Sequence, residues 1–203
     1  MVSPPISLRW AEPSPDDGLV FARYLDIAAD GAFRMMLGRR APQIVAEAYT
    51  EPGHDLSYSH VTFAERDSTV VGMASGFTAG EHSQSSERPL ISAAGIHAVR
   101  MGLAAVLGRR LFRFIDAVPD GDFYLMAVAV DDDQRGHGVG STLIDHVENE
   151  ARGRQCDRIV LDVASDNDDA RRLYERRGMA VEAESARLLL MPRMRALRMV
   201  KAL

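Results

Sequence analysis

Cysteine is almost absent from this sequence: Cys156 is the only one among 203 residues. An internal disulfide is therefore excluded, and no pair of thiols exists to hold a metal ion. The six histidines show no His-x-x-x-His or comparable spacing, so no metal site is expected. A chain of this kind suits a reducing compartment, and the expected location is the cytoplasm.

The start of the sequence also lacks a basic segment followed by an apolar run, so no secretory signal is expected. The most apolar helical stretch, about Val99 to Ile115, is interrupted by arginines at 100, 109, 110 and 113, which argues against a membrane span. The formal net charge of −5 disfavours non-specific binding to nucleic acid, which needs clustered Lys and Arg. We therefore expect neither a membrane nor a nucleic-acid partner.

The composition is that of a globular protein, with 46% hydrophobic and 26% charged residues. A domain of about 150 residues already buries roughly two-thirds of its unfolded surface, so this length can build a full core. The sequence shows no internal repeat, low-complexity segment or linker. It predicts a single domain over residues 1–203, and a two-fold homodimer is the assembly expected on base rates.

Apolar spacing and turn residues predict the elements of the first 116 residues. They are a strand at Ile6–Trp10, a helix from Pro13–Asp17 to about Ala29, a helical region at Phe33–Tyr49 broken at Gly38 and Pro42, a hairpin of Ser59–Glu65 and Thr69–Phe77, a loop at Thr78–Arg88, and a long helix at Leu90–Asp116.

From Phe123 to Val130 the sequence is continuously apolar, which indicates a strand covered on both faces. A helix to about Arg152 and a second buried strand at Arg158–Val163 complete a strand–helix–strand unit, whose two strands are normally parallel. The remaining expected elements are a helix at Asp168–Arg177 and closing strands at Ala180–Arg187 and Ala196–Ala202. Together the elements predict a mixed α/β (α+β) fold.

The turn after the central strand carries glycines at alternate positions, 136, 138 and 140, and leads directly into a helix. Glycine lets the backbone approach a ligand closely, and the first N–H groups of a helix lack internal partners. Such a turn binds anions, and a pyrophosphate is a natural occupant. Arg135 and His137 could add positive charge.

Two familiar phosphate-binding patterns fit this turn poorly. A nucleotidase P-loop ends in Gly-Lys-Ser/Thr, whereas Gly140 is followed directly by Ser141. The dinucleotide fingerprint of oxidoreductases has other glycine spacing and opens at the strand end, whereas this turn begins several residues after Val130. A dinucleotide-binding oxidoreductase remains the weaker alternative.

The segment from Val128 to Ile144 resembles the coenzyme A motif of the GNAT acetyltransferase superfamily, Gln/Arg-x-x-Gly-x-Gly/Ala, which Arg135, Gly138 and Gly140 fill. The segment from Asn167 to Met179 resembles the family's Asn-x-x-Ala-x-x-Leu-Tyr-x-x-x-Gly-Phe pattern, at the family's separation. The resemblance covers roughly Tyr124 to Met179, which gives a coenzyme A-binding core of about residues 123–179.

This resemblance implies a GNAT-like central sheet that is twisted, mixed and mostly antiparallel, with a splayed parallel strand pair and flanking helices. It also implies an N-acetyltransferase that passes the acetyl group of acetyl-CoA directly to a primary amine of a small molecule or peptide. A module that binds the coenzyme without transferring acetyl groups is the alternative within the same resemblance.

The resemblance further implies roles for individual residues. Main-chain N–H groups across Gln134 to Gly140 would hold the pyrophosphate, and Asn167 would lie near the pantetheine arm. Tyr174 would be the general acid for the departing thiolate, and the Val128 N–H would stabilise the oxyanion. The expected cofactor-binding set is Val128, Val130, Gln134, Arg135, Gly136, His137, Gly138, Val139, Gly140, Ser141, Asn167, Ala170 and Tyr174.

The general base stays open. Many members of the family place a glutamate on the central strand, but residues 123–130 contain no carboxylate. Asp162, Glu65 and His97 are candidates, and deprotonation through water is equally compatible with the sequence. Packing is the alternative role for Tyr174, and it is the expected role for Cys156, which has no motif-level histidine partner.

Overall fold

A seven-stranded sheet organises the computed structural model, which describes residues 4–186 and 195–203. The strands lie in the order β1-β2-β3-β4-β5-β7-β6, and of the described pairs only β4 and β5 are parallel. This confirms the predicted mixed, mostly antiparallel sheet. The strands are β1 Ser7–Trp10, β2 Val61–Arg66, β3 Thr69–Thr78, β4 Asp122–Val130, β5 Arg158–Ala164, β6 Ala180–Glu184 and β7 Ala196–Ala202.

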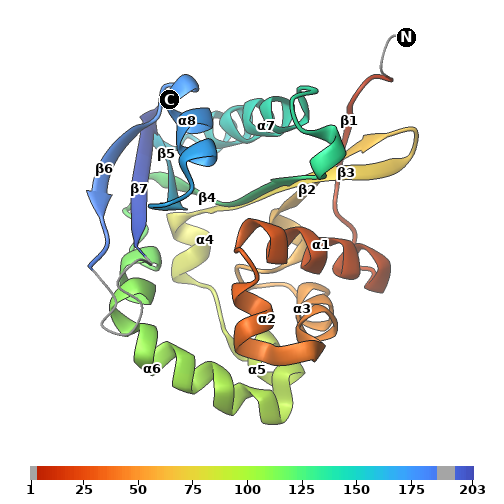
Figure 1. The fold of residues 1–203 in the computed structure, drawn as a ribbon, viewed down its shortest axis with the longest axis vertical. Coiled ribbons are helices and arrows are strands. Elements are labelled where there is room, and N and C mark those ends of the chain that lie inside the picture. The colour runs from red at the N-terminus through yellow and green to blue at the C-terminus, as the bar shows by residue number, and fades with distance from the viewer. Residues whose placement is uncertain (1–3, 187–194) are drawn as a thin grey trace.

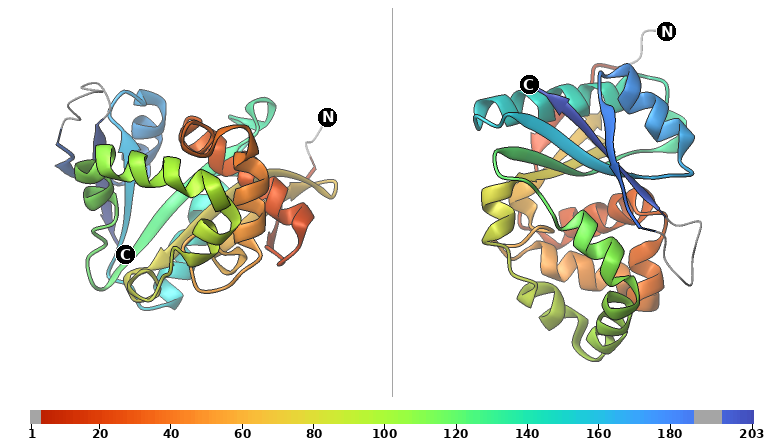
Figure 2. Two further views of the ribbon diagram at one scale, coloured as in Figure 1. Left: turned by 90° about the horizontal axis from the view of Figure 1, so that it is seen from below. Right: turned by 90° about the vertical axis from the view of Figure 1, so that its left-hand side faces the viewer.

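Helices cover both faces of this sheet (Figures 1 and 2), with α7 and α8 on one side and α1 and α3 on the other. One core lies beneath α7 and includes Leu143 and Leu161, and a second lies beneath α1 and α3 and includes Phe21 and Phe63. The helices are α1 Pro15–Ala28, α2 Ala32–Leu37, η1 Gly38–Arg40, α3 Ala41–Tyr49, η2 Tyr58–His60, α4 Ala79–Ser83, α5 Arg88–Ala94, η3 Gly95–His97, α6 Ala98–Ile115, η4 Asp132–Gln134, α7 Val139–Gly153 and α8 Asp168–Arg176.

Most of these helices and strands begin and end within a few residues of the bounds predicted from the sequence. The Ser14 hydroxyl accepts a hydrogen bond from the Asp17 N–H at 3.2 Å and so caps α1. The predicted hairpin closes through Asp67 and Ser68, both with positive φ, which is the backbone that suits the twist of two antiparallel strands. The expected strand at Ala180–Arg187 ends at Glu184, and Arg187 lies outside the described residues.

Two predictions in the first half were wrong. The segment expected to be a loop contains α4, which Thr78 and Glu81 begin with a reciprocal capping box, a signal present in the sequence. Pro42 does not break a helix but lies in the first turn of α3, where its missing N–H costs nothing. The predicted break at Gly38 is confirmed.

The long helix expected over Leu90–Asp116 is divided at Gly95, whose φ of +51° is disfavoured for residues with a side chain. The segment Arg88–Ile115 is nevertheless long and apolar enough to cross a membrane by length and composition. The expectation that no stretch could span a membrane was therefore wrong by the criterion of length and composition. The apolar run starts before Val99, and residues 90–108 contain a single arginine. Its apolar periodicity does not mark a buried face, since α6 has no buried residue.

A buried ion pair joins β5, β7 and the end of α6. The Arg198 guanidinium lies 2.7 Å from Asp162 Oδ2, and both side chains are less than a tenth exposed. Asp162 also accepts a hydrogen bond from the Tyr124 hydroxyl at 3.1 Å. Arg198 further donates to carbonyls that end α6, those of Phe114, Ile115 and Ala117. The Arg198 guanidinium therefore both caps the end of α6 and neutralises the Asp162 carboxylate.

Replacing one member of this pair should cost more stability than replacing both. We expect Arg198→Met to lower the free energy of unfolding by about 3–5 kcal/mol, because it leaves the Asp162 carboxylate buried without its partner. The combined variant Arg198→Met with Asp162→Leu should lose less. Urea unfolding of the two variants measures the difference, and an Arg198→Met protein as stable as the wild type would contradict this assignment.

Candidate active site

The central feature is a wedge between the two parallel strands. β4 and β5 are paired only where Asp122, Phe123 and Tyr124 face Arg158, Ile159 and Val160. Beyond these positions β4 continues to Val130 and β5 to Ala164, and the two strands form no further pairs with each other. The register of β4 against β3 also shifts beside Met126, which has no residue opposite it. Such a bulge bends a strand and redirects its side chains.

The diverging strands form the walls of a cleft of about 780 Å³. Residues 125–130 of β4 and 161–164 of β5 line it, and it extends to the start of α7, to α8 and to the end of α1. Sites of this size between structural elements are typical of small-molecule and cofactor binding. The splayed parallel pair inferred from the sequence therefore has a physical counterpart.

Most residues predicted to bind a coenzyme come together in this cleft. Those lining it are Val128, Val130, Gln134, Arg135, Gly136, Gly138, Gly140, Ser141, Asn167, Ala170 and Tyr174. The structure does not bring His137 and Val139 to the cleft wall. The Val139 side chain is 1% exposed and belongs to the core, whereas the His137 side chain is exposed. Only their main-chain groups could contribute to binding.

The glycine turn has the backbone geometry of an anion site. Gly136 and Gly138 have φ values of +76° and +87°, which side-chain-bearing residues rarely adopt. Gly138 precedes α7 and offers no side-chain cap. Within the described residues, no protein acceptor bonds the N–H groups of Gly136, Gly138 or residues 139–141. These donors coincide with the positive end of the α7 dipole.

Contacts from outside the turn hold it in place. Arg66, at the end of β2, donates to the Gln134 side-chain oxygen at 3.0 Å and to the His137 carbonyl at 2.9 Å. From α1, the Tyr24 hydroxyl donates to Asp131, just before the turn, at 3.0 Å. The turn is thus fixed by residues distant in sequence, so its N–H groups are oriented before a ligand arrives.

Tyr174 lies on α8 at the inner wall of the cleft. It is 9% exposed and packs within the core beneath α7. Burial raises the pKa of its hydroxyl to about 12, and the described residues offer this hydroxyl no hydrogen-bond partner. Asn167 begins the same helix, and its side-chain oxygen accepts from the Ala170 N–H at 3.1 Å. The two residues therefore share one rigid element.

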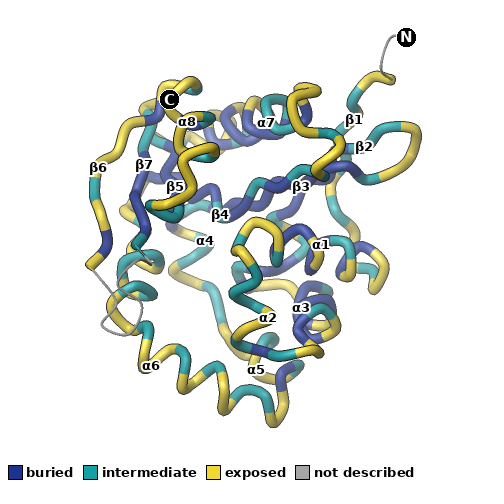
Figure 3. Tube along the Cα trace, in the orientation of Figure 1, coloured by how far each residue is buried: buried dark blue, intermediate teal, exposed yellow. Residues whose placement is uncertain are grey.

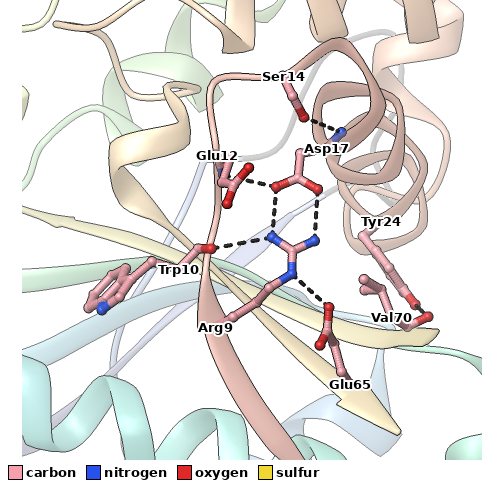
Figure 4. Close-up of polar contacts among 8 residues, drawn as sticks. All are labelled: Arg9, Trp10, Glu12, Ser14, Asp17, Tyr24, Glu65 and Val70. Atoms are coloured by element: carbon pink, nitrogen blue, oxygen red, sulfur yellow. Dashed lines mark hydrogen bonds and ion pairs between the residues drawn. The ribbon is translucent and has the colours of Figure 1, made fainter. Parts of the chain in front are cut away.

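The three residues considered as bases have other roles or positions. Asp162 lines the cleft but is paired with Arg198. Glu65 lies outside the cleft wall and bonds Arg9 at 2.6 Å, in a cluster where Arg9 also binds Asp17 through two hydrogen bonds (Figure 4). His97 lies in η3, also away from the cleft wall. None of the three is a base poised in the cleft.

The cleft also contains residues that sequence reasoning missed. The cleft wall also includes Ile27, Ala28 and Asp30, from the end of α1 and the turn after it. Asp169 on α8 joins them. No motif marks these positions, because their place in the cleft follows from how α1 packs across the sheet.

Neither the cysteine nor a metal takes part in this geometry. Cys156 is half-buried outside the cleft wall, and burial raises the pKa of its thiol, which opposes thiolate formation. The described parts of the chain contain no group of three or more His, Cys, Asp and Glu side chains that could hold a metal ion.

Comparison by sequence identifies one family. A sequence model described as the acetyltransferase (GNAT) family matches residues 36–179. No curated protein matches the chain by sequence.

Solved structures share the whole architecture. A crystal structure of an acetyltransferase is 24% identical, with a TM-score of 0.66 over 97% of this chain and 98% of that one. An N-acetyltransferase from Staphylococcus aureus Mu50 is 14% identical, with a TM-score of 0.68 over 96% and 100% of the two chains. The ribosomal-protein-S18-alanine N-acetyltransferase from Escherichia coli is 14% identical, with a TM-score of 0.52 over 98% and 94%. At these identities the likeness establishes the fold.

The role of Arg66 in orienting the turn can be measured directly. Arg66→Gln removes its charge-assisted bonds to Gln134 and His137, so we expect exchange of the hydrogen-bonded amides of Gln134, Arg135 and His137 to become about tenfold faster. The control Arg135→Gln removes an exposed arginine of the turn itself and should change exchange little. Equal protection in the wild type and the Arg66 variant would show that the turn needs no support from β2.

Proposed function

Since the chain belongs to the GNAT acetyltransferase family, we propose that it transfers the acetyl group of acetyl-CoA directly to a primary amine of a small molecule or peptide. The observation that carries the proposal is the continuous cleft from the unbonded N–H groups at the start of α7, between β4 and β5, to Tyr174. Each part of this cleft fits one part of an acyl-coenzyme.

The turn fits the coenzyme's pyrophosphate. Its N–H groups and the dipole of α7 favour negative charge, and the exposed Arg135 adds a cation. The pantetheine arm contains two amide groups, and the diverging edges of β4 and β5 can bond them as an added strand would be bonded. Asn167 and Ala170 line the cleft beside this path.

The protein must assist three events in the reaction. The neutral amine attacks the thioester carbonyl and forms the C–N bond, the carbonyl oxygen gathers negative charge, and the C–S bond breaks as the coenzyme leaves as a thiol. We assign the oxyanion donor to the Val128 N–H, which follows the β4 bulge. Tyr174 serves the departing sulfur.

The raised pKa defines how Tyr174 acts. At about 12, its hydroxyl stays protonated at neutral pH and can donate a hydrogen bond. Tyr174 therefore stabilises the developing thiolate as a donor, and the proton lost by the attacking amine balances the reaction.

Deprotonation of the amine is assigned to water. The Asp162 carboxyl group is held by Arg198 and Tyr124, and β4 carries no carboxylate beyond Asp122. A binding module that no longer transfers acetyl groups shares all the coenzyme contacts and differs only in lacking turnover. The dinucleotide-binding alternative requires a parallel sheet, whereas β4 and β5 are the one parallel pair among the described strands.

Other features remain predictions from sequence: a homodimeric assembly, a cytoplasmic location, the absence of a metal and the absence of a nucleic-acid partner. The choice of acceptor is assigned to the part of the cleft wall formed by Ile27, Ala28 and Asp30. A carboxylate at this position would attract a cationic amine and favour a primary amine over a neutral acceptor.

The donor site is tested by Gly138→Asp. The change places a carboxylate against the expected pyrophosphate and strains a backbone with φ of +87°, so we expect calorimetry to detect no acetyl-CoA binding. The matched control is Gly53→Asp, a glycine with φ of +79° and an equally open surrounding. It carries the same backbone strain away from the cleft and should bind normally. Undiminished affinity in the Gly138 variant would remove the turn from the site.

The role of Tyr174 is tested by removing its hydroxyl. Tyr174→Phe keeps the packing, so we expect kcat to fall roughly 10- to 1,000-fold with little change in coenzyme affinity, measured by free-thiol release. Tyr58→Phe, at a position outside the cleft wall, is the control and should retain full turnover. If both variants turn over equally well, Tyr174 contributes only to packing.

A further inference from the structure

Helix α6 presents large apolar side chains to solvent. Along it and the turn before it, Ile96, Val99, Leu103, Val106 and Leu107 are 87%, 77%, 62%, 72% and 59% exposed. Their spacing of three, four, three and one residues places them on one side of the helix, and we call them the α6 stripe. α6 runs along the outside of the molecule between α5 and the start of β7 (Figures 1 and 3).

This orientation is fixed by contacts near both ends of the helix. Arg198 on β7 binds the carbonyls that end α6, as described above. Near its other end, Arg100 donates to the Met35 carbonyl of α2 at 3.2 Å. The apolar side chains therefore face outward because both ends of the helix are held, and the stripe is a defined surface.

The charge around the stripe has one sign. Residues 88–115 contain five arginines and no aspartate or glutamate, within a chain of net charge −5. Helical spacing places Arg110 one turn beyond Val106, in line with the stripe, and Arg100 and Arg113 at its margins. Among the described residues, none of these arginines forms an ion pair with a carboxylate. An apolar stripe bordered by arginines complements a surface that is apolar inside and anionic outside.

A second copy of the chain fits this face poorly. Five side chains on one helix present a few hundred Å² of apolar surface, less than the roughly 800 Å² per partner of a stable interface. A two-fold contact would also bring the arginines of both copies together, which costs free energy through like-charge repulsion.

A membrane-spanning arrangement fits poorly as well. Gly95 divides the segment, leaving α6 with 18 residues that include four arginines. Crossing a bilayer would bury these charges and break the contacts that Arg198 and Arg100 make. A helix lying in the plane of the bilayer surface keeps those contacts and leaves the arginines among lipid phosphates.

We propose that the α6 stripe docks the protein on the surface of a bilayer that contains anionic phospholipid. The helix lies parallel to the surface, with its apolar side chains among the acyl chains and its arginines on the headgroup phosphates. This departs from the sequence-based expectation of no membrane partner, which treated the arginines only as interruptions of a span. The surface contact is independent of acetyl transfer.

The test is co-sedimentation of the full chain with vesicles. Two compositions are compared, phosphatidylcholine alone and phosphatidylcholine with about one third phosphatidylglycerol. We expect binding to the anionic vesicles, at least tenfold weaker binding to phosphatidylcholine, and release as salt is raised. Equal binding to both compositions, or to neither, would overturn the proposal.

Matched variants locate the contact. Arg109→Gln with Arg110→Gln should weaken binding about tenfold or more, whereas Arg39→Gln with Arg40→Gln removes another exposed adjacent arginine pair and should have little effect. Leu103→Glu should likewise abolish binding, with Leu19→Glu on α1 as its control, since both leucines are exposed. Equal effects within either matched pair would overturn the proposal. The proposal would also be overturned if the wild type did not bind vesicles but formed a dimer in solution that Leu103→Glu dissociated.

Discussion

The separation of β4 from β5 after three paired positions is the constraint on which the site depends. Two parallel strands that stayed paired would leave no room for a ligand between them. Here the β4 bulge at Met126 and the divergence of β5 open a cleft at the centre of the sheet. After β4 the chain passes through η4 into the glycine turn and α7, so the strand that forms the cleft wall also leads to the anion site.

Buried charge holds the closed end of this wedge. Arg158 on β5 binds Asp122 on β4 through two hydrogen bonds, at 2.9 and 2.7 Å. From the last paired position of β4, the Tyr124 hydroxyl donates a hydrogen bond to Asp162 on β5, which also pairs with Arg198. These contacts explain why a carboxylate inside the cleft is unsuited to act as a base: its charge is used to fix the strands and the end of α6.

The sequence could predict what depends on local order. Glycines with positive φ, an Asn that caps a helix and a continuous apolar strand are visible as residue patterns, and the structure brings most of the predicted residues to one cleft. The sequence could not predict that Asp30 faces the cleft, that Asp162 is paired, or that Val99 and Leu103 point outward, because those facts depend on packing between distant segments. The capping box that begins α4 was visible and missed. The apolar period in α6 identifies one face of the helix but does not determine what covers that face.

The central claim is that acetyl-CoA lies in the wedge with its pyrophosphate on the turn before α7. Titrating isotope-labelled protein with acetyl-CoA and following the backbone amide resonances tests it most directly. The account predicts the largest shifts at Gly136, Gly138 and residues 139–141, with smaller ones along residues 126–130 and 161–164, and none with NADH. Shifts confined to other segments, or equal shifts with NADH, would contradict it.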